Sequence, residues 1–243
     1  MRTLTAVAAL AALLSACGAP TPSPEESGGA VDPTTTTPTP EAAGTPPSGM
    51  PTPTAPPAAG EQGGSSDWRT VANADDASRL GRLDQAWRLG RAEAEDKGFA
   101  EKVEALGPLV DPNAGQAGRL QPAPGTYRCR SIKLGSHDNA GLAYVEYPWF
   151  RCTIELTPGG DLILTKTTGS QRTRGLLYPD TDRRLVFIGA QALGADETSY
   201  PAYGAQPVRD QVGVFERIGP ERWRLAIPWP KVESKLEILE LVK

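Results

Sequence analysis

The chain has 243 residues, and its 25 Lys and Arg nearly balance its 29 Asp and Glu, which gives a formal net charge of −4. Without Arg2 and the five acids of residues 18–66, 24 basic and 24 acidic residues remain for the rest of the chain. Such a neutral domain exerts no long-range attraction on a phosphate backbone, so nucleic acid is excluded as a partner.

The first seventeen residues have the order of a bacterial export signal. Arg2 supplies a positive start, residues 4–14 form an apolar run, and Leu-Ser-Ala-Cys ends at Cys17. The apolar run is too short to cross a bilayer core of about 30 Å as a helix. The ending resembles the lipobox of bacterial lipoproteins, which implies that a signal peptide of residues 1–16 is removed. Cys17 then carries palmitate-type acyl chains as a membrane anchor. The alternative is an ordinary signal peptide and a cysteine without lipid.

Gly18 follows the cysteine, in place of the Asp associated with retention in the inner membrane. In a cell with two membranes, the resemblance therefore predicts an outer-membrane lipoprotein with its domain in the periplasm. Whether the domain faces the periplasm or the cell surface stays open.

Residues 17–66 have the composition of a disordered linker. From residue 18 to residue 66 the chain holds twelve of its 24 prolines, no aromatic residue and no Lys or Arg. Such a segment buries too little apolar surface to offset the entropy of ordering it. A flexible chain of this length spans about 40 Å on average. We expect a spacer between membrane and domain; the alternative is a segment that contacts cell-wall polymer or a partner.

Residues 67–243 are expected to form one globular domain, with a helical segment at 67–118 and a β body at 119–243. In the helical segment the apolar residues recur at helical spacing, at Leu80, Leu83, Trp87 and Ala94. Asn73 or Asp75 can cap the start and Gly98 the end. The pattern predicts one amphipathic helix over about 75–97 and a short helical turn over 100–106.

After Pro124, short runs rich in β-branched and aromatic residues are separated by Gly, Pro and Asp. The eight runs are TYRCRSIKL, WFRCTIEL, DLILTKTT, RTRGLLY, RRLVFIGA, QVGVFERI, RWRLAIPW and KLEILELV. Because the links between most of them are short, neighbouring strands should be antiparallel. The prediction is a mainly β α+β fold with about eight strands in a meander. We expect a small barrel or strongly curled sheet, with the helix closing one end or packing alongside; the alternative is a two-sheet sandwich.

The last of these runs changes phase between Ile238 and Leu239, which predicts a β-bulge. Cys129 and Cys152 each lie in a predicted strand, and an even pair in an exported domain is usually a disulfide. The loop between them would contribute about 3 kcal/mol of stability on the chain-entropy estimate.

Catalytic and metal-binding signals are weak. His137 is the single histidine and lies in a predicted loop without the sequence context of a nucleophile. The chain has no zinc, phosphate-loop or dinucleotide motif, so we expect no metal, no cofactor and no identifiable catalytic residue.

The stretch TKTTGSQRTRG gathers polar side chains around glycines and suggests an anion-binding site. Its candidate residues are Lys166, Gln171, Arg172 and Arg174. Two arginines near a turn can hold a carboxylate or phosphate through bidentate contacts. Arg128 and Arg130, on the face opposite Cys129, would extend this patch if their strand lies nearby. The alternative is a solvated hairpin with basic flanks.

Several of these stretches together resemble a family of exported alphaproteobacterial proteins, domain of unknown function 4893. They are PAPGTYRCRSIKLG, YPWFRC, KTTGSQRTRG, RRLVFIGAQALG and ERWRLAIPWP, with the Asp67-Trp68-Arg69 start. The resemblance covers residues 67–242 and implies no activity and no catalytic residue.

Three functions follow as hypotheses. The first is a tethered envelope domain that binds a small anionic or apolar ligand inside a barrel, or an envelope protein on its surface. The second is an envelope hydrolase that uses acidic residues and His137. The third is a scaffold that spaces complexes from the membrane. We favour non-catalytic binding or scaffolding; ligand, partner and oligomeric state are not encoded in any motif.

Overall fold

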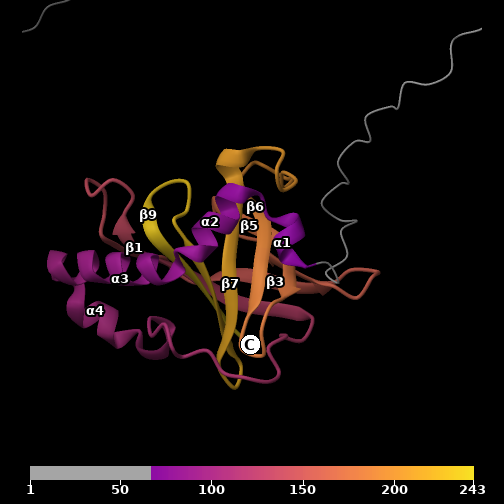
Figure 1. Ribbon diagram of the computed structural model, residues 1–243, viewed down its shortest axis with the longest axis horizontal. Helices are drawn as coiled ribbons and strands as arrows, with labels where there is room; N and C mark the ends of the chain where they lie inside the picture. Colours follow the sequence, from indigo (N-terminus) through magenta and orange to yellow (C-terminus); the bar gives the residue numbers. More distant parts are fainter. Residues whose placement is uncertain (1–66) are drawn as a thin grey trace, which may run out of the picture. The chain divides into compact units, whose positions relative to one another are not determined.

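The computed structural model describes residues 67–243 (Figure 1). The predicted signal peptide, the lipidated Cys17 and the linker of residues 17–66 lie outside the described residues. Across residues 67–243, none of the helices combines the length and the apolarity needed to cross a bilayer.

The helical segment contains several short helices in place of one long helix. They are α1 (Trp68–Val71), α2 (Ala74–Gly81), α3 (Leu83–Ala94), the kinked turn Glu95–Phe99, in which Gly98 has φ 89°, α4 (Ala100–Ala105) and a 3-10 turn at Gly107–Leu109. Asn73 caps α2, as predicted, because its side chain accepts a hydrogen bond from the Asp76 N–H at 2.8 Å. The single helix predicted over 75–97 was wrong: Arg82, with φ −107° and ψ 20°, separates α2 from α3. The break lets the two helices cover different strands.

Nine strands follow. They are β1 (Gly125–Ser136), β2 (Tyr144–Glu146), β3 (Phe150–Leu156), β4 (Leu162–Lys166), β5 (Gln171–Pro179), β6 (Leu185–Leu193), β7 (Asp210–Gly219), β8 (Arg222–Pro228) and β9 (Ser234–Val242). Each of the eight predicted runs overlaps one strand. Sequence reading missed β2, which has only three residues and pairs with the second half of β1.

The sheet closes into an eight-stranded barrel. The strands follow the order β2-β1-β3-β4-β5-β6-β7-β8-β9, every pair is antiparallel, and β9 also pairs with β1 from Arg128↔Val242 to Ser136↔Ser234. β2 lies outside this ring. The mainly β meander and the barrel are therefore confirmed, and the sandwich is not formed.

The bulge predicted in β9 was wrong. Residues 236–241 keep one register against both β8 and β1, through Ile238 and Leu239. The apparent change of phase arises because both faces of β9 are covered: Ile238 packs under the helices, and Leu239 packs inside the barrel. The irregular register occurs instead in β7, between Arg217 and Gly219.

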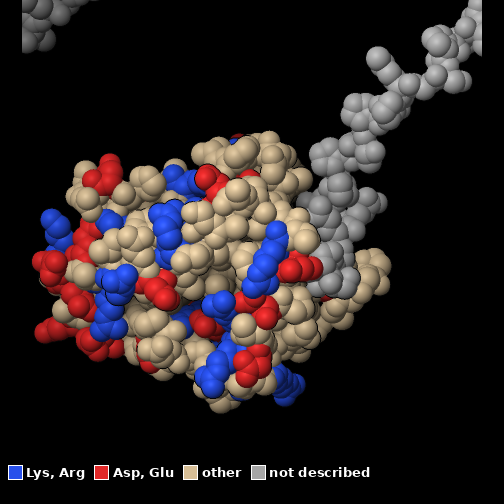
Figure 2. All heavy atoms as spheres, in the orientation of Figure 1, with Lys and Arg blue, Asp and Glu red and all other residues tan. Residues whose placement is uncertain are grey.

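The helices pack alongside the barrel on two patches of its outer surface (Figure 1). Trp87 and Ala94 of α3 join Ile132 of β1 and Ile238 of β9 in one buried cluster. On another part of the wall, β5, β6 and β7 contribute a second outer cluster that includes Tyr178 and Val212, against which residues of α1 and α2 pack. Acidic and basic side chains are interspersed on the face seen in Figure 2, apart from acidic residues where α3 and α4 meet. Such a surface fits the neutral balance of the domain.

Candidate functional site

The interior of the barrel has an apolar part and a polar part. The apolar part is filled by buried side chains that include Phe187, Phe215, Leu225 and Leu239. The disulfide between Cys129 and Cys152, predicted from the sequence, joins β1 to β3 within this cluster, with its Cα atoms 5.8 Å apart. The cysteines and their large apolar neighbours occupy the centre as a packed core.

The polar part lies at the end of the barrel where β8 turns into β9, and we call it the barrel mouth. Six strands each contribute one or two side chains that point into the barrel there. These residues are Lys133, Lys166, Gln171, Thr173, Gln191, Gln211 and Glu237. Most are nearly inaccessible: Lys133 is 4% exposed, Lys166 6% and Glu237 7%.

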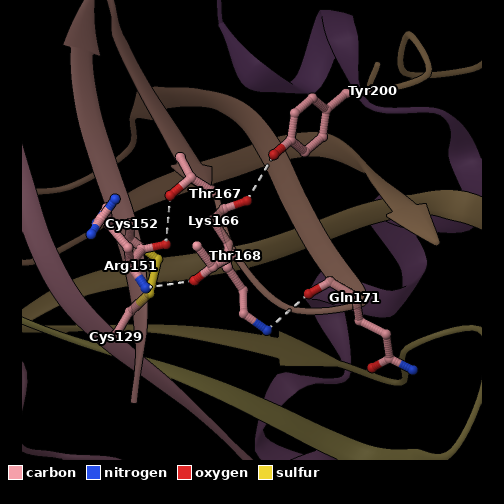
Figure 3. The surroundings of a disulfide bond; sticks show 8 residues. All are labelled: Cys129, Arg151, Cys152, Lys166, Thr167, Thr168, Gln171 and Tyr200. Carbon is pink, nitrogen blue, oxygen red and sulfur yellow. Dashed lines mark hydrogen bonds between the residues drawn. A yellow bond between two sulfur atoms is a disulfide. The ribbon is translucent and has the colours of Figure 1, made fainter. Parts of the chain in front are cut away.

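Charges at the barrel mouth are coupled. Lys133 stands directly opposite Glu237 in the β1–β9 pair. Burial lowers the pKa of Lys133, but Glu237 and Glu233 outweigh it and leave this pKa raised. Lys166 has a lowered pKa because burial outweighs the attraction of Glu237. Its Nζ donates to the carbonyl oxygen of Gln171 at 2.8 Å (Figure 3).

The four predicted anion-binding residues are divided between the two faces of the sheet. Lys166 and Gln171 face the barrel mouth, whereas Arg172 and Arg174 face outward, as the two-residue period of a strand requires. Arg172 is 8% exposed and donates to the carbonyl oxygens of Gly169 and Ala195, so its guanidinium holds the chain after β6. The four side chains therefore do not form a single site.

Arg174 instead borders a groove on the outside of the barrel, which we call the outer groove. The groove has a volume of about 380 Å³. Its lining is mostly apolar and aromatic: Val71, Ile163, Arg174, Gly175, Leu176, Tyr178, Ile188, Gly189, Ala190, Tyr200, Pro201, Ala202 and Tyr203. The floor comes from β4, β5 and β6, and the walls from α1 and the segment 200–203. Few polar groups among many apolar ones is the composition of a small-molecule site.

Hydrogen bonds hold the wall of the outer groove in place. The hydroxyl of Tyr200 donates to the carbonyl oxygen of Lys166 at 2.8 Å (Figure 3), and that of Tyr203 donates to Oδ2 of Asp76 at 2.6 Å. Burial and the bond to Asp76 raise the pKa of Tyr203 well above its ordinary value. The wall is thus tied both to the barrel and to α2.

Arg174 is the cation of the outer groove, and its charge is only loosely neutralised. Its side chain is 40% exposed, and its Nη1 lies 3.6 Å from a carboxylate oxygen of Glu155 and 3.1 Å from Oγ1 of Thr165. A guanidinium at the edge of an apolar groove can bind a carboxylate or phosphate group while the groove takes an apolar body.

The other candidates lie apart from both regions. Arg128 and Arg130 stack on the ring of Trp149, at 4.5 and 4.8 Å from its centroid, and Arg130 also pairs with Glu240. His137 is exposed in the loop between β1 and β2. Within residues 67–243, no three His, Cys, Asp or Glu side chains converge as metal ligands would.

Sequence reasoning missed Lys133, Glu237 and the apolar lining of the outer groove. Lys133 is two residues after Ser131 and four after Cys129, so the alternation of β1 already indicated that its side chain points into the barrel. Glu237 carried no comparable signal, because β9 is buried on both faces. The outer groove joins residues 71, 163 and 200–203, which are distant in the chain.

Comparison with known proteins gives a family and no relative of known activity. The family described as Domain of unknown function (DUF4893) matches residues 68–241. No curated protein and no solved structure matches the chain. Because the match covers most of the chain, from α1 into the last strand β9, this protein belongs to the DUF4893 family.

Proposed function

We propose that this protein is a lipid-anchored protein of the cell envelope whose domain binds, without catalysis, a small molecule with an apolar body and an anionic group. The observation that carries the binding proposal is the outer groove, where apolar and aromatic side chains surround about 380 Å³ and Arg174 stands at the edge. This volume lies in the range of about 300–1,000 Å³ that ligand sites occupy.

The site proposed lies outside the barrel, not within it. Side chains of the apolar cluster fill the interior, and the cavity among the polar residues of the barrel mouth measures only about 10 Å³. A cavity of that size holds about one water molecule. A ligand with a substantial apolar body therefore fits the outer groove and does not fit the interior.

The envelope part of the proposal rests on the lipobox at Cys17 and on the Pro- and Thr-rich segment that follows it. A buried disulfide between Cys129 and Cys152 supports an oxidising compartment, such as the periplasm. Several acyl chains on Cys17 would anchor the chain stably, because each buried methylene contributes about 0.8 kcal/mol. We propose the outer membrane as the destination, since Gly18 follows the cysteine.

Acyl labelling in cells tests the anchor. Radiolabelled or alkyne-tagged palmitate should enter the wild-type chain and be absent from Cys17→Ala. A Ser15→Ala variant, which keeps a small residue in the lipobox, serves as the matched control and should still be labelled. Equal labelling of wild type and Cys17→Ala, or an unprocessed chain recovered from the cytosol, would contradict the anchor.

Ligand titration tests the outer groove. Residues 18–243, the mature chain without its lipid-bearing cysteine, avoid detergent, and decanoate and decanol serve as anionic and neutral probes in calorimetry. Ala202→Phe fills the groove and should abolish binding of both probes, whereas Ala205→Phe, at an exposed site three residues further along the chain, should leave both unchanged. Arg174→Gln should weaken decanoate roughly tenfold, the loss of one charged hydrogen bond, and leave decanol unchanged.

The outcomes are decisive for the groove. Binding of decanoate by Ala202→Phe with the parent affinity would place the ligand elsewhere and overturn the proposal. If Arg174→Gln weakened the binding of decanoate and decanol equally, the proposal that the ligand carries an anionic group bound by Arg174 would be wrong.

A further inference from the structure

The carboxylate of Glu233 occupies a pocket of donors at the barrel mouth. Glu233 belongs to the loop of residues 229–233 between β8 and β9, and its side chain is 44% exposed. One carboxylate oxygen accepts from Nζ of Lys133, and the other accepts from the amide of Gln171 at 2.9 Å. The Gln171 amide oxygen in turn accepts from Lys133 at 2.7 Å. Lys133 and Gln171 thus form a carboxylate seat with both donors oriented.

The loop that delivers Glu233 has unfavourable backbone angles at both of its ends. Trp229 has φ +46° and Glu233 has φ +78°, in the left-handed region that residues with a side chain seldom adopt. Such conformations persist where the surrounding contacts enforce them, and they cluster at clamps and switches. The contact of Glu233 with Lys133 and Gln171 is one such enforcing contact.

Behind this seat, the barrel mouth carries more hydrogen-bonding capacity than its own residues use. Oε1 of Gln211 and Oγ1 of Thr173 are buried and have no hydrogen-bond partner among the described residues, and each residue is 5% exposed. Gln211 lines the same small cavity as Lys133, Gln191 and Glu237. Because a buried polar atom without a partner costs stability, these two oxygens favour a ligand or water that donates hydrogen bonds to them.

We propose that the barrel mouth is a second binding site, for a small carboxylate that bears hydroxyl groups. When the site is empty, Glu233 holds the place of the ligand carboxylate and residues 230–232 line the small cavity, so the whole loop must move out to make room for the ligand. When Glu233 moves out, Lys133 and Gln171 lose the carboxylate that accepts their hydrogen bonds, so the entering molecule must bring a carboxylate of its own. Its remaining groups meet Gln211 Oε1, Thr173 Oγ1 and the Glu237 carboxylate, which all accept hydrogen bonds. Hydroxyl groups donate to these atoms, whereas a second carboxylate would be repelled by Glu237.

This proposal is independent of the outer groove. The two sites lie on opposite faces of the sheet, as Gln171 and Arg172 do, and they take different chemistry. Gluconate is a suitable probe here, with glucose as the neutral molecule of the same size. Arg174→Gln and Ala202→Phe should leave gluconate binding unchanged, so failure of either proposal can be recognised separately.

Calorimetric titration of residues 18–243, which serve as the parent chain, tests the site. Glu233→Gln keeps the size of the side chain and removes the competing charge, so gluconate should bind at least tenfold more tightly than to the parent. Glu221→Gln, at an exposed position in the turn between β7 and β8 at the other end of the barrel, is the matched control and should bind gluconate with the affinity of the parent. Adding Lys133→Gln to Glu233→Gln should abolish the gain. Gluconate affinity that Glu233→Gln does not change, or glucose binding as tight as gluconate, would overturn the proposal.

Hydrogen exchange on the parent chain gives a test that needs no variant to fold. Saturating gluconate should make the Trp229 amide, which donates to the carbonyl oxygen of Lys235 at 2.8 Å, exchange severalfold faster, because the loop leaves the barrel mouth, while the β1 and β9 amides stay protected. Glucose at the same concentration should change neither. Unchanged or slower exchange of the Trp229 amide with gluconate would overturn the displacement of Glu233.

Discussion

Gly175 lies directly opposite Gly189 in the β5–β6 pair, and the two strands approach so closely there that neither position has room for a side chain. A Cβ on Gly175 would lie 2.3 Å from the carbonyl oxygen of Ile188, and a Cβ on Gly189 would lie 2.1 Å from that of Arg174. Their main chains form part of the floor of the outer groove. Two glycines thus shape both the curvature of the barrel and its candidate ligand site.

Replacing Gly189 with Ala should lower the free energy of unfolding by about 3 kcal/mol, because the added methyl group collides with a main-chain oxygen that cannot move without distorting β5. Urea unfolding followed by circular dichroism measures the change. Gly81→Ala, in α2 with nothing within 4 Å of the new Cβ, is the control and should raise stability by up to about 1 kcal/mol. Equal effects of the two substitutions would contradict the close approach of β5 and β6.

Arg224 should be the most sensitive charged position of the β body. Its side chain is fully buried, its Nε donates to Glu216 at 2.9 Å, and its Nη1 donates to the carbonyl oxygens of Leu109 and Asp111. Arg224→Lys keeps the charge but loses the planar fork, so stability should fall by about 2–4 kcal/mol. Arg88→Lys, at an exposed position of α3, should change the free energy of unfolding by no more than about 0.5 kcal/mol. A similar midpoint for both variants in urea would show that the guanidinium contacts contribute little.

The disulfide should contribute about 3 kcal/mol, because it closes a loop between residues 23 positions apart. Cys129→Ala with Cys152→Ala should lower the urea midpoint accordingly, while the native fold persists at low temperature. Mass spectrometry after alkylation should detect no modified cysteine in the folded oxidised chain unless a reductant is added first. Two alkylated thiols without reduction would contradict the pairing.

Stability should depend on pH through Asp210. Burial, followed by the nearby charge of Asp76, raises the pKa of Asp210, and its Oδ2 has no hydrogen-bond partner among residues 67–243. The folded state therefore binds a proton more readily than the unfolded state, and its stabilising contribution is complete at low pH. That contribution is lost as pH rises from the ordinary aspartate pKa through the raised folded pKa.

Asp210→Asn mimics the protonated side chain, so its stability relative to wild type should increase as pH rises through this window and then level off. Thermal unfolding at a series of pH values measures the difference. Asp182→Asn, exposed in the turn after β5, provides the matched exposed control. A stability difference for Asp210→Asn that is the same at acidic and neutral pH would contradict the raised pKa.

Some of the candidate sites were accessible to sequence reasoning and some were not. The alternation around Gln171 and Arg172 implies that these neighbours face opposite sides, so their separation into two sites follows from the strand period alone. Glu233 lies in a loop without any pattern, and only the closure of β9 on β1 brings it to Lys133. The outer groove required the segment 200–203 to fold back over β5, which local sequence does not encode.

By itself, the sequence determined eight of the nine strands, their antiparallel order and the disulfide, because alternation, short turns and cysteine placement act over a few neighbouring residues. Tertiary structure alone decided between the barrel and the sandwich, separated α2 from α3 at Arg82, and buried β9 on both faces. These features depend on contacts between residues far apart in the chain, such as Lys133 with Glu237. Such contacts form only when distant segments pack together, so no single segment determines their free energy.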